Sequence, residues 1–158
     1  MIFVNIACYR DPECEPTIRD LFEKARHPEQ INVGVVLQTM PSDRIDVALS
    51  RVRVARVDAS RSQGVCWARA LGYLLWQGED FVLQIDSHMR FAPDWDALLI
   101  EQLTACPSRK PILTTYPPGY EPPNRLVSMK PSFLAAKEFN NRGILMQQAL
   151  MEPEPITP

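Results

Sequence analysis

The sequence lacks any closely spaced pair of cysteines. Its four cysteines stand at scattered positions: Cys8, Cys14, Cys66 and Cys106. Zinc knuckles and redox dithiols place two thiols in a C-x-x-C spacing, so the sequence disfavours both kinds of site. Scattered thiols are typical of a protein whose cysteines stay reduced. We therefore expect free cysteines and a cytoplasmic location.

The sequence also lacks a surplus of charge and a long apolar run. Its 17 basic and 19 acidic residues give a formal net charge of −2, which supplies no basic field for nucleic acid or an anionic membrane. This balance still allows a local cationic pocket for a phosphate. The apolar residues 2–7 follow no basic region and are too short to span a bilayer. We interpret them as a first core strand, and we expect no nucleic-acid or membrane partner.

Length and apolar content indicate one folded domain. The 158 residues are 46% hydrophobic and 23% charged, which suffices for one substantial core and makes two domains improbable. We assign this domain to residues 1–150. Residues 151–158, which contain three prolines, are expected to form a disordered tail.

The hydrophobic pattern alternates between strand-like and helix-like segments. It predicts strands at residues 2–7, 31–37, 52–57, 81–88 and 111–116, and shorter ones near 126–129 and 133–137. Helices are predicted at residues 16–25, at 65–77 with Gly78 as a cap, and at 93–103. The proline-rich residues 117–123 should form an exposed loop. This alternation indicates an α/β fold with a mainly parallel sheet flanked by helices, in which ligands bind beyond the carboxyl ends of the strands.

The most distinctive segment is the apolar run that ends in Asp86-Ser87-His88. Side chains alternate along a strand, so Asp86 and His88 can point the same way. A carboxylate oxygen and an imidazole nitrogen suit a divalent ion such as manganese. The same residues also fit a turn or a helix cap beside an ordinary hydrogen-bonded histidine. Taken alone, the pair leaves both interpretations open.

A second segment places a glycine at a helix start between two arginines, Arg61 and Arg69. The N-terminus of a helix presents unpaired N–H groups and the positive end of the dipole, which favours a diphosphate. Arginine can bind phosphate oxygens in a bidentate manner. The alternative is that Arg61 and Arg69 are solvated surface cations. Gly64 lies at the start of the predicted helix, between the two arginines.

These segments together resemble nucleotide-sugar glycosyltransferases of the A-type fold. The residues that carry the resemblance are Arg61-x-x-Gly64-x-x-x-Ala68-Arg69, the run from Gln84 to Phe91, and Asp94-Trp95-Asp96. The sequence is most similar to the N-acetylglucosaminyltransferases related to the cytoplasmic enzyme that glycosylates hydroxyproline. Residues 6–13 and 17–22 are similar to the first strand and helix of that family, and the resemblance covers residues 2–117. Mucin-type N-acetylgalactosaminyltransferases share the Asp-Ser-His motif, so the motif indicates the superfamily better than the sugar.

The resemblance implies transfer of N-acetylglucosamine, or another N-acetylhexosamine, from a UDP-sugar to a hydroxyl acceptor on a protein or glycan. It implies that Asp86 and His88 hold manganese or magnesium, which neutralises charge on the departing UDP. The residues implied to lie along the nucleotide and its diphosphate are Tyr9, Arg10, Asp11, Gln38, Arg61, Gly64 and Arg69. Ser87 is implied to lie near the donor sugar, unless its side chain points to the other face of the strand. No catalytic residue is singled out.

The sequence departs from this family because no histidine follows His88. Related enzymes take a further metal ligand, often histidine, from a later segment. The chain is then a fragment, or it uses a carboxylate such as Glu121 or Glu138, or it binds a UDP-sugar without efficient transfer. A metal-dependent phosphohydrolase ranks last, because it needs a richer set of ligands.

A truncated sheet edge near the C-terminus would leave unpaired backbone groups and would favour self-association.

Two further segments have an ordinary structural interpretation beside the functional one. Trp95 is expected to lie in the core, and Asp96 is expected to be an exposed acid in the first turn of its helix. Residues 114–116 end a predicted strand and would either line the acceptor side or serve only as β-forming residues.

Overall fold

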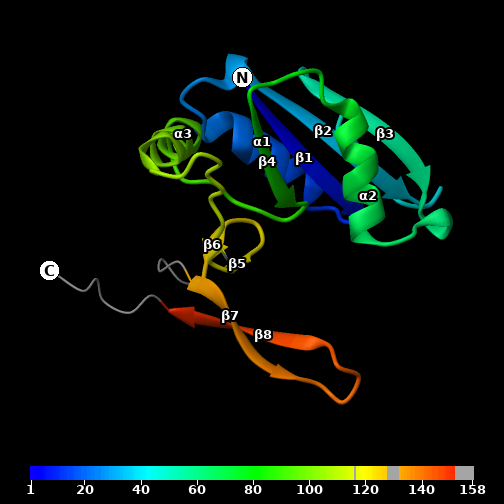
Figure 1. Ribbon diagram of the computed structural model, residues 1–158. Helices are drawn as coiled ribbons and strands as arrows, with labels where there is room; N and C mark the ends of the chain where they lie inside the picture. The colour runs from blue at the N-terminus through cyan, green and yellow to red at the C-terminus, as the bar shows by residue number, and fades with distance from the viewer. Residues whose placement is uncertain (116, 128–131, 152–158) are drawn as a thin grey trace, which may run out of the picture. The chain divides into compact units, whose positions relative to one another are not determined.

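The computed structural model in Figure 1 describes residues 1–115, 117–127 and 132–151. The chain divides into two compact units, Met1–Glu101 and Gln102–Pro158. One domain over residues 1–150 was expected from the sequence, and that expectation remains a prediction beside this division. Helix α3, Trp95–Ala105, continues from the first unit into the second.

The first unit is built on a four-stranded parallel sheet. Its strands are β1 (Ile2–Tyr9), β2 (Ile31–Thr39), β3 (Val52–Asp58) and β4 (Phe81–Asp86), in the order β3-β2-β1-β4. Strand β1 is buried along almost its whole length, as a near-continuous apolar run in a parallel sheet covered on both faces should be. The predicted α/β fold with a parallel sheet is confirmed.

The strand order reverses beside β1. The chain passes from β1 outward to β2 and β3, and then returns to pair β4 with the other side of β1. In open α/β sheets of this kind, such a reversal leaves a crevice beyond the carboxyl ends of the two strands that diverge. The ends of β1 and β4 are therefore the part of the fold where a ligand site is expected.

Helices cover the sheet on both faces (Figure 1). Helix α1, Cys14–Lys24, packs Ile18 and Leu21 against one face of β1, in a core that also contains Trp95 of α3. Helix α2, Val65–Gly72, lies on the opposite face and continues as the short 3-10 helix η3, Tyr73–Leu75. Two further 3-10 turns, η1 (Pro28–Gln30) and η2 (Ala59–Arg61), connect the elements.

Close packing between α2 and β1 depends on Gly72. A Cβ atom on Gly72 would lie 2.0 Å from the side-chain oxygen of Asn5. Asn5 is fully buried, and its Nδ2 donates a hydrogen bond of 3.0 Å to the carbonyl oxygen of Arg69. A larger residue at position 72 must therefore displace Asn5 or move the helix away from the sheet.

Gly72→Ala is expected to destabilise the protein by about 1–3 kcal/mol, because overpacking outweighs the better helix propensity of alanine. The free energy of unfolding in urea measures the effect. Gly119→Ala is the matched control, because a Cβ atom there meets nothing within 4 Å. In the double variant with Asn5→Ala the clash disappears, so the two losses should not add. Strictly additive losses would contradict this account.

The structure corrects one predicted helix boundary and one predicted exposure in the first unit. The helix predicted at 65–77 ends as an α-helix at Gly72, and Leu74 is 79% exposed because η3 turns it out of the apolar stripe. Trp95 lies in the core as expected, at 4% exposure. Asp96 was expected to be exposed but is 2% exposed. It is buried because its carboxylate accepts hydrogen bonds of 2.8 and 2.9 Å from the backbone N–H groups of Arg26 and His27, just beyond α1.

The second unit contains two antiparallel pairs among its described residues. Strand β5 (Tyr120–Glu121) pairs with β6 (Arg125–Leu126), and β7 (Ser132–Phe139) pairs with β8 (Leu145–Met151). The loop predicted at 117–123 thus contains a short strand. The segment predicted at 133–137 lies within β7, whereas β8 was not predicted. Of the segment predicted at 126–129, Leu126 ends β6, and residues 128 and 129 lie outside the described residues.

The strand predicted at residues 111–116 is not formed by residues 111–115. Pro111 has no N–H group to donate, and Ile112 is 86% exposed, so this run of β-forming residues lacks a strand to pair with. Tyr116 lies outside the described residues. So do residues 152–158 of the predicted tail, while Met151 ends β8.

The longest described helices, α1 and α3, have 11 residues each. No described helix is long and apolar enough to cross a membrane.

Candidate functional site

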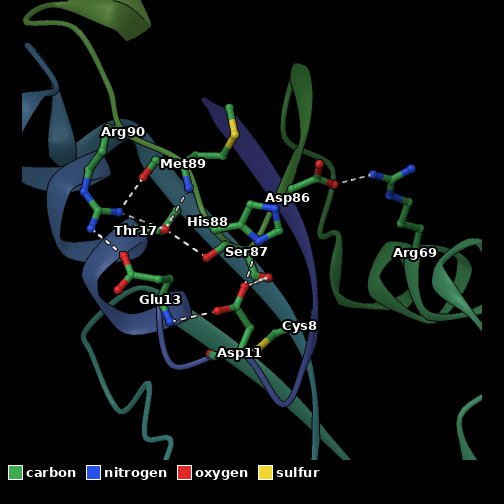
Figure 2. Close-up of polar contacts among 10 residues, drawn as sticks. All are labelled: Cys8, Asp11, Glu13, Thr17, Arg69, Asp86, Ser87, His88, Met89 and Arg90. Atoms are coloured by element: carbon green, nitrogen blue, oxygen red, sulfur yellow. Dashed lines mark hydrogen bonds and ion pairs between the residues drawn. The ribbon is translucent and has the colours of Figure 1, made fainter. Parts of the chain in front are cut away.

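The candidate site lies at the carboxyl ends of β1 and β4. Ala7 of β1 pairs with Asp86 of β4, so the loops that leave these two strands start side by side. One loop carries Asp11, and the other carries Ser87 and His88. Figure 2 shows these side chains converging at the strand ends.

Asp86 forms an ion pair with Arg69 of α2. The neighbouring Ile85 points into the core, and the alternation of β4 places Asp86 on the face covered by α2. An Nη atom of Arg69 donates a hydrogen bond of 2.8 Å to Oδ1 of Asp86 (Figure 2). The Asp86 side chain remains 56% exposed, and its Oδ2 has no hydrogen-bond partner among the described residues. The predicted metal ligand and the predicted diphosphate arginine are therefore neighbours.

Asp11 forms the centre of a second group of contacts. Its Oδ2 accepts hydrogen bonds from the hydroxyl of Ser87, at 2.6 Å, and from Nδ1 of His88, at 2.8 Å. Its Oδ1 accepts a bond of 2.9 Å from the backbone N–H of Glu13. Partial burial alone would raise the pKa of Asp11, but these hydrogen bonds outweigh it and hold the pKa below the usual range.

This arrangement differs in part from the roles that the resemblance implied. Asp11 was expected at the edge of the uracil and ribose, and its carboxylate instead contacts Ser87 and His88. The Ser87 side chain is directed to Asp11 and is 5% exposed. The nearness of Ser87 to a donor sugar remains a prediction.

The loop after β4 is bound to α1 by side chains that the sequence analysis did not single out. The hydroxyl of Thr17 donates to the carbonyl oxygen of Ser87, at 2.8 Å, and accepts from the N–H of Met89, at 3.0 Å. Asp20 accepts a bond of 2.7 Å from the N–H of Phe91. Thr17 and Asp20 are three residues apart beside the apolar stripe of α1, and polar residues on a buried helix face are the signal that could have identified them.

A further ion pair joins the same two segments. Arg90, whose side chain is 6% exposed, donates a hydrogen bond of 2.6 Å to Glu13. The segment around His88 is therefore anchored to α1 and to Glu13, the residue that precedes α1. His88 itself keeps a side chain that is 62% exposed.

A pocket lies beside this site, at the ends of β1 and β2 and the start of α2. It has a volume of about 540 Å³ and is lined by Tyr9, Gln38, Ala59, Ser60, Ser62, Gly64 and Val65. It thus brings together three of the residues implied to contact the nucleotide. Gln38 is 2% exposed; its Nε2 donates to the carbonyl oxygen of Cys8, at 3.3 Å, and its Oε1 has no partner. A buried acceptor without a partner is rare in native proteins and calls for a donor, which water or a ligand can supply.

Gly64 precedes α2 with a φ of 93°, a conformation that favours glycine. A Cβ atom on Gly64 would meet nothing within 4 Å, so the helix start is open to a ligand. Arg10 and Arg61 are placed differently. Arg10 makes a bidentate pair with Asp43, at 2.9 and 3.0 Å, which raises the pKa of Arg10. Arg61 is exposed in η2 and has no ion pair among the described residues.

The described residues hold no group of three histidine, cysteine, aspartate or glutamate side chains that could bind a metal ion. Asp86 and His88 come from the same strand end, and a third protein ligand is not found beside them in this part of the chain. The carboxylates considered as substitutes form ion pairs elsewhere, Glu121 with Arg125 and Glu138 with Lys137. Metal binding by Asp86 and His88 therefore remains a prediction.

The parallel sheet, the flanking helices and the polar site at the strand reversal define a Rossmann-like α/β protein. Within this class, the family model described as Glycosyltransferase (GlcNAc) matches residues 1–50 and 44–156. The chain belongs to this glycosyltransferase family, which confirms the predicted fold and the prediction of a transferase. No curated protein and no solved structure gives a significant match. The narrower relationship to the hydroxyproline-modifying enzyme remains a prediction.

Proposed function

We propose that this chain transfers N-acetylglucosamine from UDP-N-acetylglucosamine to a hydroxyl group of a protein or glycan. The observation that carries the proposal is the placement of Asp86, His88 and Arg69 at the strand reversal, next to a pocket lined by Tyr9, Gln38 and Gly64. Charged groups for a diphosphate and a pocket for a base are therefore adjacent in a fold that binds ligands at this edge.

The pocket suits the uridine half of the donor. A small rotation of the Gln38 amide would let its unpartnered Oε1, which is buried, accept the N3–H of uracil. Tyr9, which is 55% exposed and lines the pocket, offers an aromatic face on which a base can stack. At the other side of the pocket, the open start of α2 at Gly64 favours the diphosphate through its free N–H groups and dipole.

Asp86 and His88 are proposed to hold a divalent ion, manganese or magnesium. They fit it because Oδ2 of Asp86 and Nε2 of His88 have no partner among the described residues, and both side chains are accessible. When bound, the ion would neutralise negative charge on the UDP leaving group. Arg69 would keep Asp86 oriented and contribute a second positive charge toward the diphosphate. Phosphate oxygens and water are available to complete the coordination.

A UDP-sugar-binding protein without efficient transfer is the second candidate. It is favoured by the finding that the described residues hold no group of three histidine, cysteine, aspartate or glutamate side chains that could bind a metal ion. In either case we propose a reducing, cytoplasmic setting, because all four cysteines are free.

UDP together with Mn²⁺ is expected to raise the melting temperature by roughly 5–10 °C at a UDP concentration about 100 times the dissociation constant. Differential scanning fluorimetry measures the shift. ADP is the control ligand, and Gln38→Leu should weaken the response to UDP because the leucine cannot accept a hydrogen bond from uracil. If UDP does not shift the melting temperature, with or without metal, the assignment of the donor site is wrong. Release of UDP from UDP-N-acetylglucosamine then separates the transferase from the binding protein.

A further inference from the structure

The carboxylate of Asp11 is directed toward the loop that bears His88. Its Oδ2 is shared by the Ser87 hydroxyl and Nδ1 of His88, and its Oδ1 is held by the backbone of Glu13 (Figure 2). The Asp11 side chain is 19% exposed. The described hydrogen bonds of the Asp11 carboxylate therefore either fix Asp11 itself or hold Ser87 and His88.

The contact with Asp11 determines which nitrogen of His88 is available. A carboxylate only accepts hydrogen bonds, so a neutral imidazole beside it carries its proton on Nδ1. Its lone pair then lies on Nε2, which has no partner among the described residues and belongs to a side chain that is 62% exposed. Without this contact, an exposed imidazole would populate both tautomers and several ring orientations.

We infer that Asp11 is a positioning residue that holds His88 in the Nδ1–H tautomer, with Nε2 directed outward to bind the divalent ion. This inference rests on the proposed function for the identity of the ligand. A carboxylate that accepts the second N–H of a metal-binding histidine fixes the ring and increases the basicity of the ligating nitrogen. Asp11 is thereby assigned to the metal side of the site instead of the uridine edge.

Two neighbours give Asp11 the rigidity that this role requires. The hydroxyl of Ser87 donates its single hydrogen to Oδ2 of Asp11, and the N–H of Glu13 fixes Oδ1. Ser87 is in turn held through its carbonyl oxygen by Thr17, which is fully buried. The imidazole is thus already oriented before the ion binds, so binding costs little additional conformational entropy.

Asp11→Asn tests the inference, because asparagine keeps the shape but can donate to Nδ1 through its amide. In the metal-free variant at a pH where His88 is neutral, we expect ¹⁵N NMR to show a shift of His88 toward the Nε2–H tautomer. His27, the only other histidine, is the internal reference and should not change. Mn²⁺ affinity, measured by electron paramagnetic resonance of free Mn²⁺, should fall by roughly 10–100-fold.

Ser87→Ala is the matched control, since it removes the other hydrogen bond to the same oxygen and leaves the His88 contact in place. It should change the tautomer much less than Asp11→Asn does. An unchanged His88 tautomer in Asp11→Asn would overturn the inference. Failure of the wild-type protein to bind Mn²⁺ would instead overturn the proposed metal site, and the NMR result on metal-free protein would still decide the role of Asp11.

Discussion

Asp86→Asn is expected to slow the release of UDP from UDP-N-acetylglucosamine by roughly 10²–10³-fold. Asparagine retains an oxygen that can accept from Arg69, but it loses the negative charge that would hold a divalent ion. Stabilisation of a leaving group by a metal contributes several kcal/mol to the transition state, and each 1.4 kcal/mol corresponds to a factor of ten. A coupled assay for free UDP measures the rate, with acceptor water or an added hydroxyl compound.

Asp80→Asn is the matched control for this substitution. Asp80 stands just before β4, at the end of the strand opposite to Asp86, and its exposed carboxylate pairs with the N-terminal ammonium group at 2.6 Å. It should leave UDP release unchanged. His88→Ala should resemble Asp86→Asn, whereas His27→Ala should not. An active Asp86→Asn variant would exclude this carboxylate as the residue that holds the metal.

Glu79→Gln is expected to lower the free energy of unfolding by about 3 kcal/mol at neutral pH. Glu79 is 7% exposed and accepts hydrogen bonds from Arg53 at 2.8 Å, from Asn32 at 2.9 Å and from the N–H of Gln77 at 2.8 Å. Burial alone would raise its pKa, but these bonds prevail and lower it from 4.5 to about 2. A fall in the pKa from 4.5 to about 2 corresponds to about 3 kcal/mol of stability.

The pH dependence of this loss has a definite sign. The folded state prefers ionised Glu79, so its contribution is complete above pH 4.5 and disappears as the pH falls toward 2. The gap in stability between the wild-type protein and Glu79→Gln should therefore close over this range. Urea unfolding at several pH values measures the gap, with Asp80→Asn as a control for a neighbouring exposed carboxylate. A gap that persisted at pH 2 would contradict this account.

The sequence predicted the elements whose apolar pattern is long and regular. Strands β1, β2 and β4 were predicted within about two residues, because a buried parallel strand is an apolar run and polar or proline residues mark its ends. The family resemblance implied that Tyr9, Gln38 and Gly64 lie along the nucleotide, and all three line one pocket in the structure. Arg69 reaches Asp86 for a different reason, because α2 lies on the face of the sheet toward which Asp86 points.

The contacts made by the loops could not be predicted from such patterns. The bond between Asp11 and His88 spans 77 residues and depends on the conformations of two loops. Asp96 was expected to be exposed because it lies in a first helical turn. In the structure two backbone N–H groups just beyond α1 donate hydrogen bonds to its carboxylate, and Asp96 is therefore buried. The strand expected at 111–116 failed because β-propensity requires a partner strand.

The hydroxyl of Thr17 brackets His88 by bonding the residues on either side of it. A loop tied in this way to a core helix cannot open by itself, because a movement of the backbone at His88 must first break the buried contacts with Thr17. Adaptation to a bound donor would then come from the half-buried Arg69 and from the exposed start of α2. The two sides of the site would respond differently to a ligand: the β4 side as a rigid template and the α2 side as the part that closes on it.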